Sequence, residues 1–443
     1  MDQGQQPGAR EKRYSVVVVG DGIAASACRI ALRRVPNLDV YRAAAPPPQD
    51  QRTPPVLVLW TNALAALAAI DRAAKSPGVD VSPYSFPLER LDIRGKHGEL
   101  LWALPAGALG RRFGPTSHTE IAGTKTPQAL QLEPRVTDAT KFADALRTLG
   151  ESPDAGTVSQ ACPGSPLTCD DGPKDPDLVI LADGAGSKLR AVLQDRKGHH
   201  AWSEPSRDSG VVVFVGECGV AQSGLTADGV ATATQGDGVR FGISQKPGTT
   251  ERQVWYAFLR ADALSEARRV SGACVLSPDQ KAELVGVLRA LHAPIADIAR
   301  ETKVINARPL QLRRPDERWH VELDRAPHAK QHVIVLGDAA HPMMPDLGQG
   351  CAMALEDVAV LRRELGRALE AKPRASDPLG EAIDAWEERR RPRVERVWRL
   401  SAAAAGLGSM HAPSLVRESV LRGPFAVTSL AVFEDLLGES VAD

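Results

Sequence analysis

Residues 337–350 constrain the fold more than any other segment of this 443-residue chain. The four apolar residues before them, 333–336, are typical of a buried parallel strand. After Gly348-Gln349-Gly350, apolar residues recur at helical spacing, which predicts a helix that begins there. Asp338 is therefore expected at the carboxyl end of a strand, close to the first turn of a helix.

This arrangement suits a flavin. A carboxylate at Asp338 can accept hydrogen bonds from the hydroxyls of a sugar or ribityl chain, although aspartates at strand ends are often only turn or capping residues. Pro345 and the glycines Gly348 and Gly350 allow the helix start to approach an electron-rich ring. Backbone N–H groups near Gln349 then face that ring, and the positive helix end stabilises negative charge on a reduced flavin.

A second motif lies near the start of the chain, where the apolar residues 15–19 precede Gly20-Asp21-Gly22 and an alanine-rich helical segment. Gly20 and Gly22 permit a tight turn and a close approach of the backbone to a pyrophosphate. Ala25 can replace the third glycine of a dinucleotide-binding turn. In isolation this motif is weak, because an ordinary turn between a strand and a helix can have the same glycines.

The pattern GDAAHPxxPxxGQGxxxAxED over residues 337–357 resembles the second FAD motif of the class A flavoprotein monooxygenases, the aromatic hydroxylases similar to p-hydroxybenzoate and salicylate hydroxylase. Residues 183–190, DGAGSKLR, resemble the DGxxSxxR motif of the same family, which implies a role for Asp183 in flavin and nicotinamide binding. A structural ion pair between Asp183 and Arg190 is the alternative. Three motifs in the family's order argue against coincidence.

The resemblance extends at lower specificity over residues 14–410, and it draws three arginines into the candidate cofactor site. Arg42 ends the second strand, where dinucleotide folds usually have an acidic residue for the adenosine ribose. It is either exposed to solvent or a sign of altered adenosine contacts. Arg135 is the nearest match to a family arginine that opens a helix in RxxL form, and Arg52 aligns with another flavin-contacting arginine.

Charge and cysteine usage favour a small-molecule role. The chain has 54 lysines and arginines against 55 acidic residues, which gives no electrostatic argument for nucleic acid or an anionic membrane. The six cysteines lack CxxC or Cys/His ligand spacing, so no metal site is expected, and even the closest pair, Cys162 and Cys169, is expected to be reduced. The polar first residues and the absence of long apolar runs predict a cytoplasmic protein without an integral membrane segment, either a monomer or a homodimer.

The order of motifs predicts an α/β fold: a Rossmann-like FAD-binding domain, an inserted antiparallel-sheet substrate domain and a helical C-terminal segment. Strand patterns at 210–216, 239–245 and 254–259 indicate the antiparallel sheet. The expected ranges are 14–204 and 325–370 for the FAD domain, with part of 76–130 contributing to the substrate side, 205–324 for the substrate domain, and 371–443 for the C-terminal helices.

The family resemblance implies an FAD-dependent monooxygenase that consumes NADPH or NADH and O2. It would hydroxylate or epoxidise an electron-rich aromatic or unsaturated small molecule through a flavin C4a-hydroperoxide. Because FAD performs this chemistry, no catalytic side chain is assigned, and His341 is expected to be structural. The alternatives are a halogenase, although the WxWxIP signature is missing, a prenyl reductase, or a non-catalytic FAD-binding protein.

Overall fold

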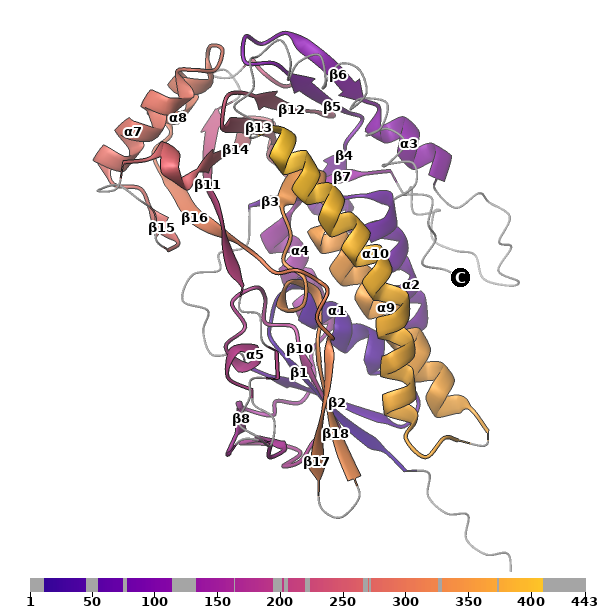
Figure 1. The fold of residues 1–443 in the computed structure, drawn as a ribbon. Coiled ribbons are helices and arrows are strands. Elements are labelled where there is room, and N and C mark those ends of the chain that lie inside the picture. Colours follow the sequence, from indigo (N-terminus) through magenta and orange to yellow (C-terminus); the bar gives the residue numbers. More distant parts are fainter. Residues whose placement is uncertain are drawn as a thin grey trace, which may run out of the picture.

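The computed structural model describes most of the chain. The described residues are 12–44, 55–74, 78–113, 133–162, 164–193, 201–202, 206–219, 224–265, 270, 272–325, 329–372 and 374–408. Two large sheets dominate them, one of five strands and one of eight (Figure 1). Arg52 and residues 409–443 of the predicted C-terminal helices lie outside this description.

The five-stranded sheet has the order β17-β18-β10-β1-β2. The central strands β1 and β10 are almost entirely apolar because they are buried within the sheet, and only the edge strand β17 runs antiparallel to its neighbour. The strands are β1 (Tyr14–Val19), β2 (Leu38–Ala43), β10 (Leu178–Leu181), β17 (His320–Arg325) and β18 (Ala329–Val335). The main helices beside them are α1 (Ile23–Leu32), α2 (Thr61–Ala74), α4 (Ala139–Leu149), α9 (Gly350–Glu370) and α10 (Pro378–Gly408).

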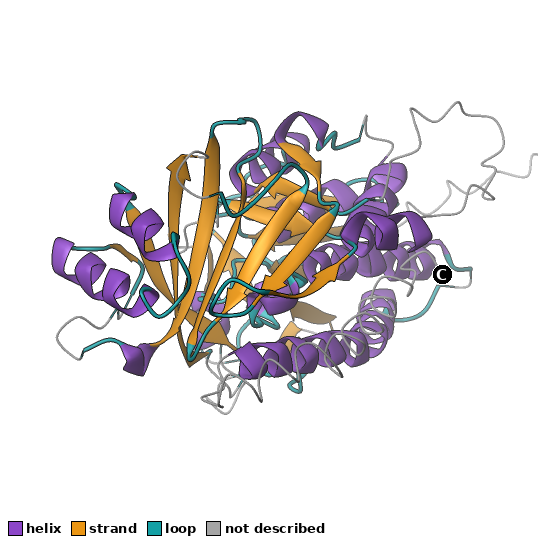
Figure 2. Cartoon of the chain, turned by 90° about the horizontal axis from the view of Figure 1, so that it is seen from above, coloured by secondary structure: helices purple, strands orange, loops and turns teal. Residues whose placement is uncertain are grey.

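The eight-stranded sheet has the order β15-β16-β11-β14-β13-β12-β5-β6 and is mostly antiparallel. Helices α7 (Pro278–Leu288) and α8 (Ile295–Glu301) pack on one face around an apolar core of their own (Figures 1 and 2). The strands are β5 (Arg90–Arg94), β6 (Leu100–Leu104), β11 (Arg207–Gly219), β12 (Val230–Gln235), β13 (Val239–Gln245), β14 (Arg252–Arg260), β15 (Cys274–Val275) and β16 (Ile305–Leu312).

Smaller elements complete the fold. A three-stranded sheet contains β3 (Val56–Leu59), β4 (Ser85–Pro87) and β7 (Arg135–Asp138), and a two-stranded one contains β8 (Val158–Gln160) and β9 (Leu167–Cys169). The short helices are α3 (Ala106–Phe113), α5 (Lys188–Val192) and the 3-10 turns η1 (Ser82–Tyr84), η2 (Ala261–Ala263), η4 (Gly337–Ala339) and η5 (Pro345–Leu347).

The predicted fold class is confirmed. The expected boundary at residue 324 falls inside β17, which pairs with β18 in the five-stranded sheet, whereas β5 and β6 from the 76–130 region join the eight-stranded sheet. The six cysteines, all within the described ranges, are free thiols. Among the described helices, none combines the length and the apolar character needed to cross a bilayer.

Candidate functional site

The three sequence motifs meet at one edge of the five-stranded sheet, because β1, β10 and β18 are neighbouring parallel strands. A Cβ atom added to Gly20 would lie 2.6 Å from the carbonyl oxygen of Ala182, the residue before Asp183. A Cβ atom on Gly337 would lie 3.3 Å from the Cβ of Ala24 on α1. The carboxyl ends of three strands therefore bring the turn after β1, Asp183 and the segment after β18 together.

The turn after β1 has the shape that a pyrophosphate site requires. Gly20 has a φ of 118°, a conformation that favours glycine. No described atom lies within 4 Å of a Cβ added to Gly22, and no side chain caps the start of α1 there. Arg29 supports the turn from below by donating from Nη1 to the Gly20 carbonyl (2.8 Å), and Ala25 is fully buried. The open backbone at Gly22 fits an anionic group at a helix start.

Asp338 is accessible to solvent although protein atoms surround it. Burial raises the pKa of its carboxyl group, while His341 and Arg308 oppose the rise. Its Oδ1 atom lies 4.0 Å from the position of a Cβ on Gly350, the first residue of α9. Cys351 lies near Asp338, and burial followed by the Asp338 carboxylate raises the pKa of the Cys351 thiol to about 12. An acceptor thus stands opposite a helix start, as the ribityl interpretation requires.

The segment between η5 and α9 leaves a polar group without a protein partner. Gly348 has a φ of 61°, and a Cβ there would lie 2.9 Å from the indole Nε1 of Trp60. The buried Gln349 accepts a hydrogen bond at Oε1 from Asn62 (2.9 Å), but its Nε2 atom has no partner among the described residues. A buried, unpaired amide beside an uncapped helix start fits the polar edge of a flavin ring.

His341 belongs to the framework behind this segment. Its Nε2 atom lies 2.7 Å from Asp357 Oδ2, and the same oxygen accepts from the Gly337 amide (3.2 Å). Arg390 donates from Nε to the other Asp357 oxygen (2.8 Å), and Trp386 donates to the Asp357 carbonyl (3.0 Å). These contacts agree with the structural role expected for His341.

Asp183 and Arg190 do not form the ion pair considered as an alternative. Arg190 pairs instead with Glu317 (2.7 Å). Burial raises the pKa of Asp183, against a hydrogen bond from Ser187, and burial together with Arg313 lowers the pKa of Arg190 to about 9. Asp183 Oδ1 is buried and has no hydrogen-bond partner in the described chain.

The predicted arginine contacts have protein partners. Arg42, at the carboxyl end of β2, pairs with Asp154 (2.8 Å) in a half-exposed position. Arg135 donates from Nε to Ser85 Oγ (2.6 Å) and stands opposite Leu59, the residue before Trp60. Their roles in cofactor binding stay predictions, and Arg52 lies outside the described residues.

One face of the eight-stranded sheet is directed toward the cofactor segment. Arg240, Phe258, Val213 and Arg308 are paired across four adjacent strands, so their side chains share this face. The alternate residues point to the opposite face and form the core with α7 and α8. On the cofactor side, Tyr256 donates to the Val56 carbonyl (2.9 Å).

Two contacts join this face to η5. The buried Arg240 pairs with the buried Asp346, and the Arg240 guanidinium lies 4.9 Å from the centre of the Phe258 ring. Val211 and Met344 form an apolar cluster with Ala405 of α10, and the partly buried Phe258, Leu310 and Leu312 pack against this cluster. The sequence indicated strands here, but their alternation did not reveal which face would meet the cofactor segment.

Comparisons with known proteins found relatives by sequence and by structure. Residues 297–401 match the model of a family described as FAD binding domain. The chain is 33% identical over 199 residues to aurachin C monooxygenase/isomerase of Stigmatella aurantiaca, covering 44% of each chain. It is 25% identical over 421 residues to zeaxanthin epoxidase of Oryza sativa subsp. japonica, covering 91% of this chain and 57% of the relative. It thus spans less than two thirds of the length of these relatives.

The fold is also found in solved structures. Klebsiella pneumoniae HpxO complexed with FAD and uric acid superposes with a TM-score of 0.70 at 18% identity, covering 96% of both chains. A salicylate hydroxylase substrate complex superposes with a TM-score of 0.67 at 15% identity, covering 96% of this chain and 98% of the other. Together with the family match, these findings confirm the resemblance that the three motifs indicated.

Proposed function

We propose that this chain, a relative of the class A flavoprotein monooxygenases, is an FAD-dependent monooxygenase that consumes NADPH or NADH. Substrate, O2, NAD(P)H and a proton would give the hydroxylated or epoxidised product, NAD(P)⁺ and water. The observation that carries the proposal is the exposed carboxyl group of Asp338 beside the start of α9, on the side toward which the Arg240–Arg308 row of the eight-stranded sheet is directed. The strand-end segments would form the cofactor side of the site and the sheet its substrate side.

The protein's contribution is to hold the two reactants and exclude water. FAD, when bound, supplies the activation of O2 with electrons from the nicotinamide. Gly22 would receive the pyrophosphate at the open start of α1, and Asp338 would accept hydrogen bonds from the ribityl hydroxyls. The uncapped start of α9 would stabilise negative charge on the flavin ring. The apolar cluster around Met344 would keep water from this region.

The substrate side favours an aromatic or unsaturated molecule. Phe258, Leu310 and Leu312 are partly buried apolar residues, and Arg308 lies in the same row as Phe258. Such a wall binds a planar or apolar body and one polar substituent. The names of relatives support this class, since they include aurachin C monooxygenase/isomerase, zeaxanthin epoxidase and 6-hydroxynicotinate 3-monooxygenase.

The test uses the purified full chain loaded with FAD. NADPH and NADH oxidation is followed by absorbance across a panel of aromatic and polyunsaturated compounds, and the products formed under ¹⁸O2 are analysed by mass spectrometry. A monooxygenase gives substrate-stimulated oxidation and one labelled oxygen atom in the product. Product oxygen that comes only from water would contradict the proposal. Reduction of the substrate without O2, or halide incorporation, would identify a different flavoenzyme on this scaffold.

A further inference from the structure

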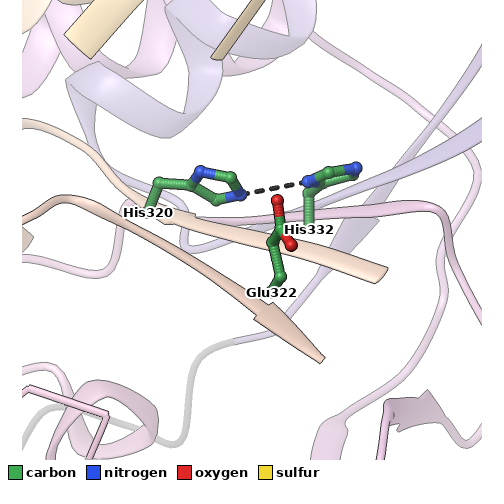
Figure 3. Close-up of side chains that lie close together, drawn as sticks. All are labelled: His320, Glu322 and His332. Atoms are coloured by element: carbon green, nitrogen blue, oxygen red, sulfur yellow. Dashed lines mark hydrogen bonds between the residues drawn. The ribbon is translucent and has the colours of Figure 1, made fainter. Parts of the chain in front are cut away.

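Two histidines and a glutamate converge on the β17–β18 hairpin, outside the cofactor site (Figure 3). His320 and Glu322 are two residues apart on β17 and therefore share a face, and Glu322 stands directly opposite His332 of β18. His320 Nε2 lies 3.0 Å from His332 Nδ1. One ligand atom from each of the three side chains falls within 4.8 Å of the others.

We propose that His320, Glu322 and His332 bind a divalent transition-metal ion of the Zn²⁺ type. Two imidazole nitrogens about 2.1 Å from one zinc ion at a tetrahedral angle lie about 3.4 Å apart. The observed separation of 3.0 Å needs only a small opening of the pair. Imidazole and carboxylate are ligands that zinc accepts, and a water molecule would complete the tetrahedron.

Carboxylates stand behind both imidazoles. His332 Nε2 lies 3.1 Å from Asp377 Oδ1, which also accepts from the Gly380 amide. His320 Nδ1 lies 3.7 Å from Asp384 Oδ1. Metal-binding histidines typically donate their second ring N–H to a carboxylate, which fixes the tautomer and orients the ring. With His332 donating to Asp377, its Nδ1 lone pair points at His320.

A metal ion would replace one proton between the rings. Without metal, His320 donates from Nε2 to His332 Nδ1. With metal, the His320 proton moves to Nδ1, which faces Asp384, so that both facing nitrogens offer lone pairs.

Charge and access also suit a cation. The imidazoles of His320 and His332 are 3% and 2% exposed, whereas the Glu322 side chain is 37% exposed and opens the cluster to solvent. Glu322 pairs with Lys330 in the present arrangement, so the metal must displace this surface ammonium. A surface pair of this kind contributes little stability and is readily exchanged.

The proposed ion would have a structural role. His332 lies within β18, three residues before its last residue, and precedes Asp338 by six residues, so the metal would lie more than about 10 Å from the cofactor segment. Two carboxylates stand behind the imidazoles of the proposed site. Asp377 lies just before α10, and Asp384 lies within its first turns. Binding would therefore tie the edge hairpin of the five-stranded sheet to the start of the longest helix.

The test is calorimetric titration of ZnCl2 into the chelator-treated full chain, with melting temperatures measured with and without zinc. We expect one zinc ion per chain and a higher melting temperature. His320→Gln should abolish binding and Glu322→Gln should weaken it at least tenfold. Asp377→Asn should weaken it by about 10- to 100-fold through loss of the orienting hydrogen bond.

Two control variants separate this site from general effects. His97→Gln removes an exposed histidine of the β5–β6 turn and should bind zinc as the unaltered chain does. Lys330→Gln frees Glu322 and should bind zinc at least as tightly. Because Glu322 lies at the surface, Glu322→Gln tests the proposal even if the histidine variants fold poorly. Absence of one-to-one zinc binding, or binding unchanged in Glu322→Gln and His320→Gln, would overturn it.

Discussion

At the scale of single residues, substitutions at Gly20 and Gly22 should have different effects. The first should lower the stability of the turn, and the second should lower its affinity for a cofactor. Gly20→Ala would place a methyl group 2.6 Å from a backbone oxygen at a φ of 118°, so the apoprotein should be destabilised by at least about 1–2 kcal/mol. Gly22→Ala meets no described atom within 4 Å and should leave stability within about 0.5 kcal/mol. Its methyl group would instead occupy the space proposed for the pyrophosphate.

Gly22→Ala is therefore expected to weaken FAD binding about tenfold without changing urea unfolding of the apoprotein, because the methyl group blocks close approach of the phosphate to the backbone. Quenching of flavin fluorescence measures the affinity. Normal FAD affinity in Gly22→Ala would show that the pyrophosphate does not lie at the start of α1.

Asp338→Ala should lower FAD affinity by about 10- to 150-fold, the range expected when a hydrogen bond to a charged group worth about 1.5–3 kcal/mol is lost. The apoprotein should be at least as stable at neutral pH. Burial raises the pKa of Asp338, so the folded state disfavours the ionised form, and this carboxylate lowers stability as the pH rises above its ordinary pKa of 3.8.

Asp279→Ala is the matched control, since Asp279 is exposed in the first turn of α7 on the far side of the large sheet. FAD titrations of both variants decide the outcome. If Asp338→Ala binds FAD as tightly as Asp279→Ala does, the ribityl assignment is wrong.

At the scale of elements, α9 and α10 are joined by buried ion pairs that underlie the cofactor segment. Arg390 bridges Glu356 (2.6 Å) and Asp357 (2.8 Å), and Arg393 also pairs with Glu356 (2.6 Å). Asn62 of α2 donates to both Glu356 and Gln349. The position of the α9 start thus depends on side chains of α10 and α2.

Arg390→Gln should lower the free energy of unfolding by about 3–5 kcal/mol, because it leaves two buried carboxylates without their shared cation. Its neighbour Arg389 is half-exposed and contacts Glu364 at 3.3 Å, so Arg389→Gln should cost less than about 1 kcal/mol. Urea unfolding of the two variants gives the comparison. Equal losses would mean that the buried network contributes no more than a surface pair.

The same network predicts a loss of stability in acid. Burial raises the pKa of Glu356 and Asp357, but Arg390 acting on Glu356, and His341 with Arg390 acting on Asp357, outweigh it, so both pKa values are lowered. In the unfolded chain these groups titrate near 4.5 and 3.8. The stabilisation is present above that range and is lost as the pH falls through the lower folded values. Unfolding from pH 7 to pH 3 should show a smaller decline in Arg390→Gln than in the unaltered chain.

Local sequence patterns predicted individual helices and strands well. They predicted poorly which distant elements pair with one another. The valine run before Gly20 and the spacing of Asp338, Gly348 and Gly350 placed the cofactor segments, because glycine geometry and strand ends are local properties. The face of the sheet on which Tyr256 and Arg308 lie depends on the register between strands that are far apart in the sequence. His320 and His332 are not separated by a spacing typical of metal-ligand motifs. They come together only because β17 and β18 pair, so the sequence alone predicted no metal site.

At the scale of the whole molecule, the two large sheets are held together by long elements and by the contacts between them. Strands β11 and β16 extend from the eight-stranded sheet toward the five-stranded one, and α10 runs past both sheets (Figure 1). Where they meet, Ala405 of α10, Val211 of β11 and Met344 share an apolar cluster. The position of the large sheet relative to the cofactor segment therefore depends on contacts between elements far apart in the sequence.

The largely buried pair of Arg240 and Asp346 is one contact between the large sheet and the cofactor segment. Burial lowers the pKa of Arg240 to about 10, yet the group stays charged near pH 7 and ties β13 to η5. Under the proposed function, Arg240→Gln should loosen the segment, admit water and let electrons from NAD(P)H reduce O2 to hydrogen peroxide. The ratio of product formed to NAD(P)H consumed should fall at least twofold.

Arg260→Gln is the control for this last prediction, because Arg260 lies on the same face of β14 but is half-exposed and pairs with Asp262. Product, NAD(P)H and peroxide are measured together for both variants. The double variant Arg240→Gln/Asp346→Asn removes the buried charge that Arg240→Gln alone leaves, so it should recover stability. The ratio of product to NAD(P)H consumed should recover in the double variant only if the unpaired charge of Asp346 opens the site. It should stay low if the site opens because the contact between β13 and η5 is lost. An unchanged ratio in folded Arg240→Gln would show that this contact does not govern water access.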